Sequence, residues 1–455
     1  MTEMDVSRRR LLTAVLAGAA GLLAGQAFGD APTPKAPGLP KKVFAHYMVC
    51  CPTAGSQATI GDLIKEMGEA QRRGLDGFAL NCGGWNKGGD YYKARCVQMY
   101  EAAKLMGTGF ELFISMDYCC INYLDETRDA IETFRDHPNQ FKVGGKPVLS
   151  TFGGEGHTPQ PAQEKIALVH KMGGFFVPFF FPTNYGAFDD ANVAEILKYY
   201  GEADGYFFFG AVGTGTEISR NSRRLAEAWH KAGKVYMAPI TPYYRSYVIS
   251  ETRGFTSMAQ EWEGAIRDGA DWAEIVTWND WNEKTYVAPF GAPSDTHVWG
   301  GDDDGYGAIN YSHVAYLDAS RYYVNWFKTG RQPKIIQDTL FYFYRTEPKA
   351  AKGKELSPKQ IQQHLTSFPG ADTLVDNVFV TCFLSKPAHL TIHSGTMSRT
   401  FDLPAGVHHV DMPFALGAQR FTLTRGGRIL KDKTGEHEIA DRQGETRYNY
   451  FSGEA

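Results

Sequence analysis

Residues 43–82, VFAHYMVCCPTAGSQATIGDLIKEMGEAQRRGLDGFALNC, contain the pattern that decides the fold. Two short apolar runs, VFAHYMV at 43–49 and GFALNC at 77–82, flank a segment in which apolar residues recur at helical spacing between Ile60 and Met67. Nearly continuous apolar runs of this length are typical of strands that are buried on both faces of a parallel sheet. The stretch therefore predicts a strand, a helix and a second strand parallel to the first.

The same alternation continues along the chain to about residue 330. Amphipathic segments, most of which end at a glycine, separate six further apolar runs: ELFISMDY (111–118), KPVLSTFG (146–153), FFVPFFF (175–181), GYFFFGA (205–211), KVYMAPITP (234–242) and WAEIVTWND (272–280). Eight strands, each followed by a helix, predict an α/β fold in which the strands close into a (β/α)8 or TIM barrel. A doubly wound open sheet is the alternative, although this chain lacks the Gly-rich phosphate turn of such folds.

The pattern changes from about residue 333. Short runs such as TLFYFYRTEP (339–348) and QRFTLTRGG (419–427) are joined by turns of Gly, Pro, Asn and Asp, and several of them alternate apolar and polar residues. This pattern is typical of a small antiparallel β-sandwich. We therefore expect a catalytic barrel at 41–332 and a β-sandwich domain at 333–455, with the aromatic residues near 341–344 in its core.

The N-terminus has the pattern of a targeting segment. The arginines of SRRRLL (7–12) directly precede an Ala- and Gly-rich apolar run that ends near Leu23, too short for a comfortable membrane span. The pattern resembles a twin-arginine signal peptide at 1–29, followed by a Pro-rich linker at 30–40. We expect a periplasmic or secreted protein that is not held at a membrane after signal cleavage. An uncleaved anchor helix is the alternative.

The composition excludes several classes of protein. Hydrophobic residues make up 43% of the chain, which excludes global disorder. The net charge is −4 and no long Lys/Arg run follows the N-terminus, so nucleic acid is not an expected partner. The aromatic content of 13% fits a surface that stacks on sugar rings, although large cores also use such residues. The sequence does not determine the oligomeric state.

Seven cysteines include two adjacent pairs, Cys50-Cys51 and Cys119-Cys120, that lack the CxxC spacing of zinc sites. Disulfides or buried thiols are therefore expected rather than a metal. Acidic residues at 301–305, GDDDG, lack the alternating ligands of a calcium loop, and we interpret them as a solvated loop. No Walker loop, HExxH motif or GxSxG elbow occurs, and we expect neither a metal nor another cofactor.

Polar residues at the carboxyl ends of the predicted strands are the candidate site residues, because (β/α)8 barrels carry their active sites there. We expect substrate binding by the following residues: His46, Asn81, Asp117, Tyr118, Glu155 and Tyr243. For His46 inside an apolar run, a hydrogen-bonded core histidine is the alternative. For Asp117 we favour binding of a substrate hydroxyl.

The strongest signal is WNDWNE at 278–283, directly after the last predicted strand. Glycoside hydrolysis needs one carboxylic acid to protonate the leaving oxygen and a second carboxylate to activate water or attack the sugar. Asp280 and Glu283 are roughly 10 Å apart in extended chain, and a bend would bring them to the separation of inverting enzymes. Trp278 and Trp281 are expected to stack on sugar faces and Asn279 to bind a hydroxyl. The alternative is that these acids only cap a helix or form ion pairs.

At these residues the chain resembles glycoside hydrolase family 71, the α-1,3-glucanases or mutanases. The resembling stretches appear in family order between residue 43 and about residue 336: VFAHYMV, RRGLDGFALN, LFISMDY, GKPVLSTFGGEG, VYMAPITPYY, EIVTWNDWNEKTYVAPF and YYVNWFKTGRQPKI. The resemblance implies inverting endo-type hydrolysis of α-1,3-glucan, with Glu283 as general acid and Asp280 as general base, or the reverse. His46, Asn81, Asp117 and Tyr286 match positions that line the family's cleft.

The chain also departs from the family pattern. Thr285 replaces a histidine of better-known members, Lys284 places a positive charge beside Glu283, and Glu155 is displaced by one or two positions. These changes leave a charged or substituted glycan open as the substrate. An enzyme that cleaves α-mannan and a non-catalytic carbohydrate-binding envelope protein are the other hypotheses. Together with the export signal, the resemblance suggests a bacterial member.

Overall fold

The computed structural model describes residues 38–86, 91–117, 124–153, 159–180, 188–246, 248–289, 310–351, 370–442 and 448–455. These residues form two units. The first comprises residues up to 210 together with 216–240 and 261–278, and the second comprises 211–215, 241–260 and the chain from 279 onward. The predicted signal peptide and most of the linker lie outside the described residues.

All eight predicted strands are present in the first unit. They are β1 (Lys42–Met48), β2 (Gly77–Cys82), β3 (Glu111–Asp117), β5 (Lys146–Gly153), β6 (Phe175–Phe180), β7 (Gly205–Phe207), β8 (Val235–Ile240) and β9 (Trp272–Ile275). They form one parallel sheet in the order β6-β5-β3-β2-β1-β9-β8-β7, and β4 (Lys142–Val143) adds a short antiparallel pairing to β5. Their near-complete burial explains why the sequence shows them as continuous apolar runs.

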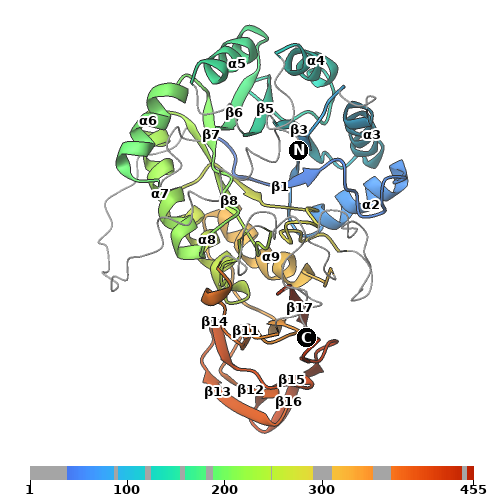
Figure 1. Cartoon of the computed structure of the whole chain (residues 1–455), viewed down its shortest axis with the longest axis vertical. Helices are drawn as coiled ribbons and strands as arrows, with labels where there is room; N and C mark the ends of the chain where they lie inside the picture. Colours follow the sequence, from blue (N-terminus) through green and yellow to red (C-terminus); the bar gives the residue numbers. More distant parts are fainter. Residues whose placement is uncertain are drawn as a thin grey trace. The chain divides into compact units, whose positions relative to one another are not determined.

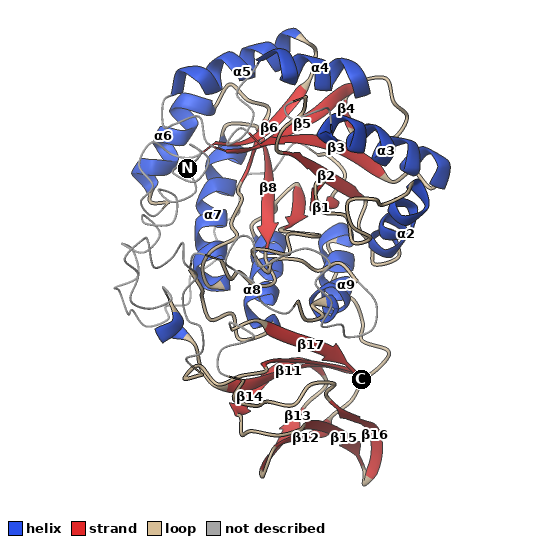
Figure 2. Ribbon diagram, turned by 45° about the vertical axis from the view of Figure 1, so that its right-hand side comes forward, coloured by secondary structure: helices blue, strands red, loops and turns tan. Residues whose placement is uncertain are grey.

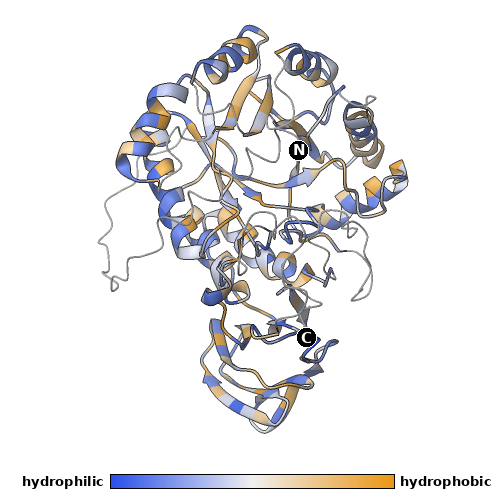
Figure 3. Cartoon of the chain, viewed as in Figure 1, coloured by the Kyte–Doolittle hydropathy of each residue, from blue (hydrophilic) through white to orange (hydrophobic). Residues whose placement is uncertain are grey.

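Helices lie along the outer side of this curved sheet (Figures 1 and 2). Those of the first unit are α2 (Ile60–Gln71), α3 (Tyr91–Met106), α4 (Leu124–Phe134), α5 (Pro159–Lys171), α6 (Asp190–Tyr200) and α7 (Gly215–Lys231). Helix α2 begins at Thr59, whose hydroxyl accepts the Asp62 N–H while the Asp62 carboxylate accepts the Thr59 N–H, a capping box. Its buried face includes Leu63 and Met67, as the spacing predicted. Figure 3 shows hydrophobic colouring on β5 and β6, whereas the helices carry both colours.

Three of the strands are each preceded by an aspartate that bonds to the neighbouring strand at the amino end of the sheet. Asp76, just before β2, accepts the Val43 N–H (2.8 Å) and donates its own N–H to the Val43 carbonyl (2.7 Å). Asp271 makes the same two bonds to Tyr236 before β9. Asp204 makes them to Phe176 before β7, and so links β7 to β6, the two ends of the strand order.

Aromatic rings fill the inside of the sheet near its amino ends. The Phe44 ring lies 5.0 Å from those of Phe113 and Phe141, and Phe141 lies 4.9 Å from Trp272. Because side chains alternate along a strand, residues two positions beyond Phe44 and Trp272 face the same interior. His46 and Glu274 occupy those positions.

The second unit contains two four-stranded antiparallel sheets, as predicted for the C-terminal part of the chain. The first has the order β14-β11-β10-β17 and the second β13-β12-β15-β16. The strands are β10 (Thr339–Arg345), β11 (Asn377–Leu384), β12 (Ala388–Ser394), β13 (Met397–Leu403), β14 (Gly406–Pro413), β15 (Gln419–Arg425), β16 (Arg428–Thr434) and β17 (Tyr450–Glu454). A short 3-10 helix, η3 (Ala371–Thr373), precedes β11. Helix α9 (Val314–Thr329) also belongs to this unit and matches the helix predicted after the eighth strand, whereas α8 (Phe255–Arg267) has residues in both units.

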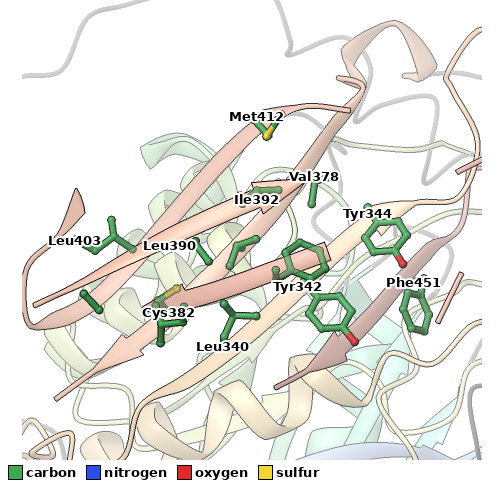
Figure 4. Close-up of a cluster of buried hydrophobic side chains, with 14 of the residues drawn as sticks. Leu340, Tyr342, Tyr344, Val378, Cys382, Leu390, Ile392, Leu403, Met412 and Phe451 are labelled. Carbon is green, nitrogen blue, oxygen red and sulfur yellow. The ribbon is translucent and has the colours of Figure 1, made fainter. Parts of the chain in front are cut away.

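The core of the β-sandwich combines residues from both sheets (Figure 4). Tyr342 and Tyr344 of β10 belong to it, together with Leu390 and Ile392 of β12. The Tyr342 ring stacks on Phe421 at 4.4 Å. The aromatic residues at 341–344 are therefore buried, as the sequence predicted.

Replacing Asp338 by Asn is expected to destabilise the protein by about 1 kcal/mol at neutral pH. The Asp338 carboxylate accepts hydrogen bonds from the Arg425 guanidinium (2.8 and 3.0 Å) and from Ser385, and these donors lower the pKa of Asp338 to about 2. An unfolded aspartate has a pKa near 4, so the contribution is present above about pH 4 and is lost as the pH falls toward 2. Urea unfolding at about pH 7 and about pH 2.5 measures it. A difference between wild type and variant that stays equal at both pH values would contradict this account.

None of the five described cysteines, Cys50, Cys51, Cys82, Cys96 and Cys382, takes part in a disulfide. The sulfurs of Cys82 and Cys96 lie 3.2 Å apart in the core, well beyond the S–S bond length of about 2.05 Å. They are buried thiols, one of the two predicted outcomes. Cys119 and Cys120 lie outside the described residues. Within the described ranges, no helix is long and apolar enough to cross a membrane.

Candidate active site

The first unit presents three predicted site residues on the inside of its sheet. His46, Asn81 and Asp117 come from the neighbouring strands β1, β2 and β3 and are each at most 3% exposed. Asn81 pairs with Met48, four residues beyond Phe44, and Asp117 lies four residues beyond Phe113. Since Phe44 and Phe113 touch inside the sheet, alternation places all three polar side chains on that same face.

His46 is paired with an acid that the sequence analysis did not identify. Its Nδ1 lies 2.7 Å from Oε1 of Glu274 in β9, and both side chains are 1% exposed. Burial raises the pKa of the Glu274 carboxyl, and the hydrogen bond to His46 opposes that rise. The Phe209 ring meets the imidazole edge-on at 5.0 Å. The sequence could have indicated this pairing, because Glu274 lies within the apolar run WAEIV and a buried carboxylate almost always has a partner.

Trp278 is buried and anchored in the first unit. Its indole N–H donates to Oε2 of Glu66 in α2 (2.9 Å), and its backbone N–H donates to the His46 carbonyl (2.7 Å). Oε1 of Glu66 accepts the Thr53 N–H (2.9 Å), so both carboxylate oxygens have donors. Burial raises the pKa of Glu66, and these hydrogen bonds oppose the rise. The contact of Trp278 with a sugar stays a prediction.

The two predicted catalytic acids lie at a turn of the second unit. Residues 281–284 form this turn, Asp280 directly precedes it, and Asp280 and Glu283 are both partly exposed. Oδ1 of Asp280 accepts the Glu283 N–H (3.0 Å), so the chain bends between the two acids. The Glu283 carbonyl accepts the Arg245 N–H (2.9 Å), and the Tyr244 hydroxyl lies 3.5 Å from Oε1 of Glu283. Both residues are thus partly exposed at a hydrogen-bonded turn.

Lys284 ends this turn and bonds to a different residue. Its φ is +58°, the left-handed conformation that lets the chain reverse direction after the turn. Its side chain is buried and Nζ donates to Oδ1 of Asn310 (2.6 Å). The ammonium therefore has a structural partner on the segment that precedes α9.

Aromatic site candidates of the second unit are buried and hydrogen-bonded. The Tyr243 hydroxyl donates to the Tyr448 carbonyl (2.7 Å), and the Tyr286 hydroxyl donates to the Tyr311 carbonyl (2.6 Å). The Tyr286 ring stacks on His313 with a centroid distance of 4.3 Å. Burial lowers the pKa of His313 to about 4, so this imidazole is neutral at physiological pH.

The Trp281 ring lies 4.7 Å from the Tyr286 ring, and both Trp281 and Asn279 are buried. Tyr118, Glu155 and the acidic loop at 301–305 lie outside the described residues. In the described part of the chain, no group of three or more His, Cys, Asp or Glu side chains is arranged to hold a metal ion.

Sequence comparison identifies a family and relatives that are similar to this chain. The family model of glycosyl hydrolase family 71 matches residues 39–455. Glucan endo-1,3-alpha-glucosidase agn1 of Schizosaccharomyces pombe is 28% identical over 437 residues, which cover 91% of this chain and 94% of that protein. Mutanase Pc12g07500 of Penicillium rubens is 27% identical over 430 residues, covering 91% of this chain and 88% of the mutanase.

Among solved structures, a GH99 endo-alpha-mannosidase from Bacteroides thetaiotaomicron is similar, with a TM-score of 0.51 and 15% identity. It is matched over its full length and over 65% of this chain. At that identity the similarity concerns the fold alone.

Proposed function

This chain belongs to glycosyl hydrolase family 71, and we propose that it hydrolyses α-1,3-linked glucan with inversion at the anomeric carbon. The family match extends over nearly all of the chain after the export segment. The match covers 94% of one relative, which is named a glucan endo-1,3-alpha-glucosidase, and 88% of another, which is named a mutanase. The observation that carries the proposal is the turn at 281–284, where Oδ1 of Asp280 accepts the Glu283 N–H and both acidic residues are partly exposed.

Glu283 is the general acid and Asp280 the general base in this proposal. Glu283 protonates the glycosidic oxygen of the leaving sugar, while Asp280 removes a proton from the water that attacks the anomeric carbon. The C–O bond to the leaving sugar breaks as the new C–O bond forms on the opposite face. The backbone N–H of Glu283 donates to Oδ1 of Asp280, which holds this carboxylate in position for the role of base.

Substrate binding is proposed for the remaining candidate residues. Carboxylate, amide and imidazole groups are suited to sugar hydroxyls, and aromatic side chains to the apolar faces of the rings. The proposed binding residues are His46, Asn81, Asp117, Tyr118, Glu155, Tyr243, Trp278, Asn279, Trp281 and Tyr286.

We also propose the architecture and export route that the sequence predicts. The parallel sheet is a closed (β/α)8 barrel within 41–332, which the Asp204 link between β6 and β7 supports, and the β-sandwich domain occupies 333–455. The segment at 1–29 directs twin-arginine export to the periplasm or medium, and supports a bacterial origin.

The substrate is tested by product analysis on a matched panel. The purified protein is incubated with α-1,3-glucan, α-1,4-glucan and α-1,6-mannan, and reducing ends and oligosaccharide masses are followed over time. We expect products from α-1,3-glucan alone. Cleavage of mannan in place of glucan would replace the substrate assignment, and binding of α-1,3-glucan without any product would support a non-catalytic carbohydrate-binding protein.

A further inference from the structure

Glu274 is a buried acid for which the proposed acid–base pair has no use. It lies in β9 two residues after Trp272, so it faces the inside of the sheet with His46 and not the helices. One carboxylate oxygen, Oε1, is engaged by Nδ1 of His46 at 2.7 Å. The His46 contact therefore occupies one side of the carboxylate and uses one ring nitrogen.

The other oxygen of Glu274 has no hydrogen-bond partner among the residues that the structure describes. Oε2 is buried and receives no hydrogen bond, and the hydroxyl of Ser115 on β3 is in the same condition. Ser115 pairs with Asn81, and alternation places it on the same inner face. A buried carboxylate oxygen without a donor is unfavourable, so among the described residues the contact with His46 is what holds this side chain in place.

Two other buried acids of the first unit, Glu66 and Asp271, serve for comparison. Glu66 receives a donor at each oxygen, from Thr53 and from Trp278. Asp271 pairs with His230 at 3.0 Å, with both side chains 1% exposed, and also accepts the Tyr236 N–H. The His230–Asp271 pair matches His46–Glu274 in chemistry and burial. Among the described residues, however, neither carboxylate oxygen of Asp271 is a buried atom that lacks a hydrogen bond.

We propose that Glu274 is a substrate-positioning residue, which fixes the His46 imidazole through Oε1. Nε2 of His46, which this pair leaves unused, is then presented to a hydroxyl of a bound hexopyranose ring. The inference rests on the proposed function for the identity of the glycan. The fixed imidazole requires no glycan and can be observed separately.

The test compares Glu274→Gln with Asp271→Asn, each introduced into an Asp280→Asn protein so that binding is measured without turnover. Glutamine keeps the shape of Glu274 but weakens the hydrogen bond that fixes His46. We expect calorimetric binding of an α-1,3-linked glucotetraose to weaken about tenfold or more in Glu274→Gln. Binding should change by less than about twofold in Asp271→Asn, because that pair lies at the amino end of β9.

Long-range 1H–15N spectra of histidine-labelled protein give the readout that requires no glycan. In the wild type the His46 signals should report a proton on Nδ1, and Glu274→Gln should shift them, while Asp271→Asn leaves them unchanged. Thermal melting identifies variants that fail to fold, and Glu274→Asp, which keeps the charge but shortens the reach, then replaces Glu274→Gln with the same expected direction.

Each outcome bears on a separate claim. Equal binding by the Glu274 and Asp271 variants, or unchanged His46 signals in the Glu274 variant, would overturn the positioning role even if the enzyme cleaves α-1,3-glucan. Absence of glucotetraose binding to the Asp280→Asn parent would instead contradict the glucan assignment. In that case the His46 spectra alone decide whether Glu274 fixes the imidazole.

Discussion

Turnover of α-1,3-glucan is expected to fall by roughly a hundred- to ten-thousand-fold when Glu283 is replaced by Gln. The amide cannot protonate the leaving oxygen, but it preserves the side-chain volume and an oxygen facing Tyr244. The backbone N–H that bonds Asp280 is also unchanged, so the turn should persist. Initial rates of reducing-end release, with thermal melting as the check of folding, measure the effect.

The loss should depend on the leaving group. The aryl oxide of an activated aryl α-glucoside leaves without protonation. Glu283→Gln should therefore retain far more of its rate on that substrate than on the polymer. Asn282→Ala is the matched control, because Asn282 is exposed in the same turn and has no role in the proposal. A Glu283→Gln protein that hydrolyses glucan at the wild-type rate, or an equally large loss in Asn282→Ala, would contradict the assignment.

Replacing Asp280 by Asn is expected to produce a loss of similar size, but on the polymer and the aryl glucoside alike. Water must be deprotonated whichever group leaves, and the amide cannot accept that proton. The Asn oxygen can still accept the Glu283 N–H, so a folding defect is not expected. Rates on both substrates, together with glucan binding, make the measurement.

Retained binding with lost turnover would assign Asp280 to chemistry and not to substrate recognition. If the Asp280 variant were rescued by the aryl substrate and the Glu283 variant were not, the two roles would be reversed. If neither replacement changed the rate, the catalytic turn itself would be excluded.

The strands of the first unit were predictable because burial on both faces gives a continuous apolar run. Every one of the eight runs forms a strand, and Gly-terminated amphipathic segments such as 60–71 form the helices between them. The change of pattern near residue 333 likewise marked the antiparallel sheets. In these segments the local periodicity and the tertiary environment favour the same structure.

The candidate site was less predictable because its partners come from distant parts of the chain. The sequence placed His46 inside the sheet but not its contact with Glu274, which is 228 residues away. It did not indicate that the buried indole of Trp278 donates to Glu66, which is 212 residues away. It placed the Lys284 charge beside Glu283 but did not indicate that Nζ donates to Asn310, which is 26 residues away. Spacing defines the face of an element, and packing alone decides which atoms meet.

The configuration of the first product released from an α-1,3-linked glucan oligosaccharide tests the central claim most directly, since the claim is that Asp280 activates a water while Glu283 protonates the departing sugar. Proton NMR spectra recorded within the first minutes of the reaction distinguish the two anomers before they interconvert. We predict that the β-anomer appears first. An initial α-anomer would show that a carboxylate attacks the sugar instead, and no hydrolysis at all would contradict the proposed substrate.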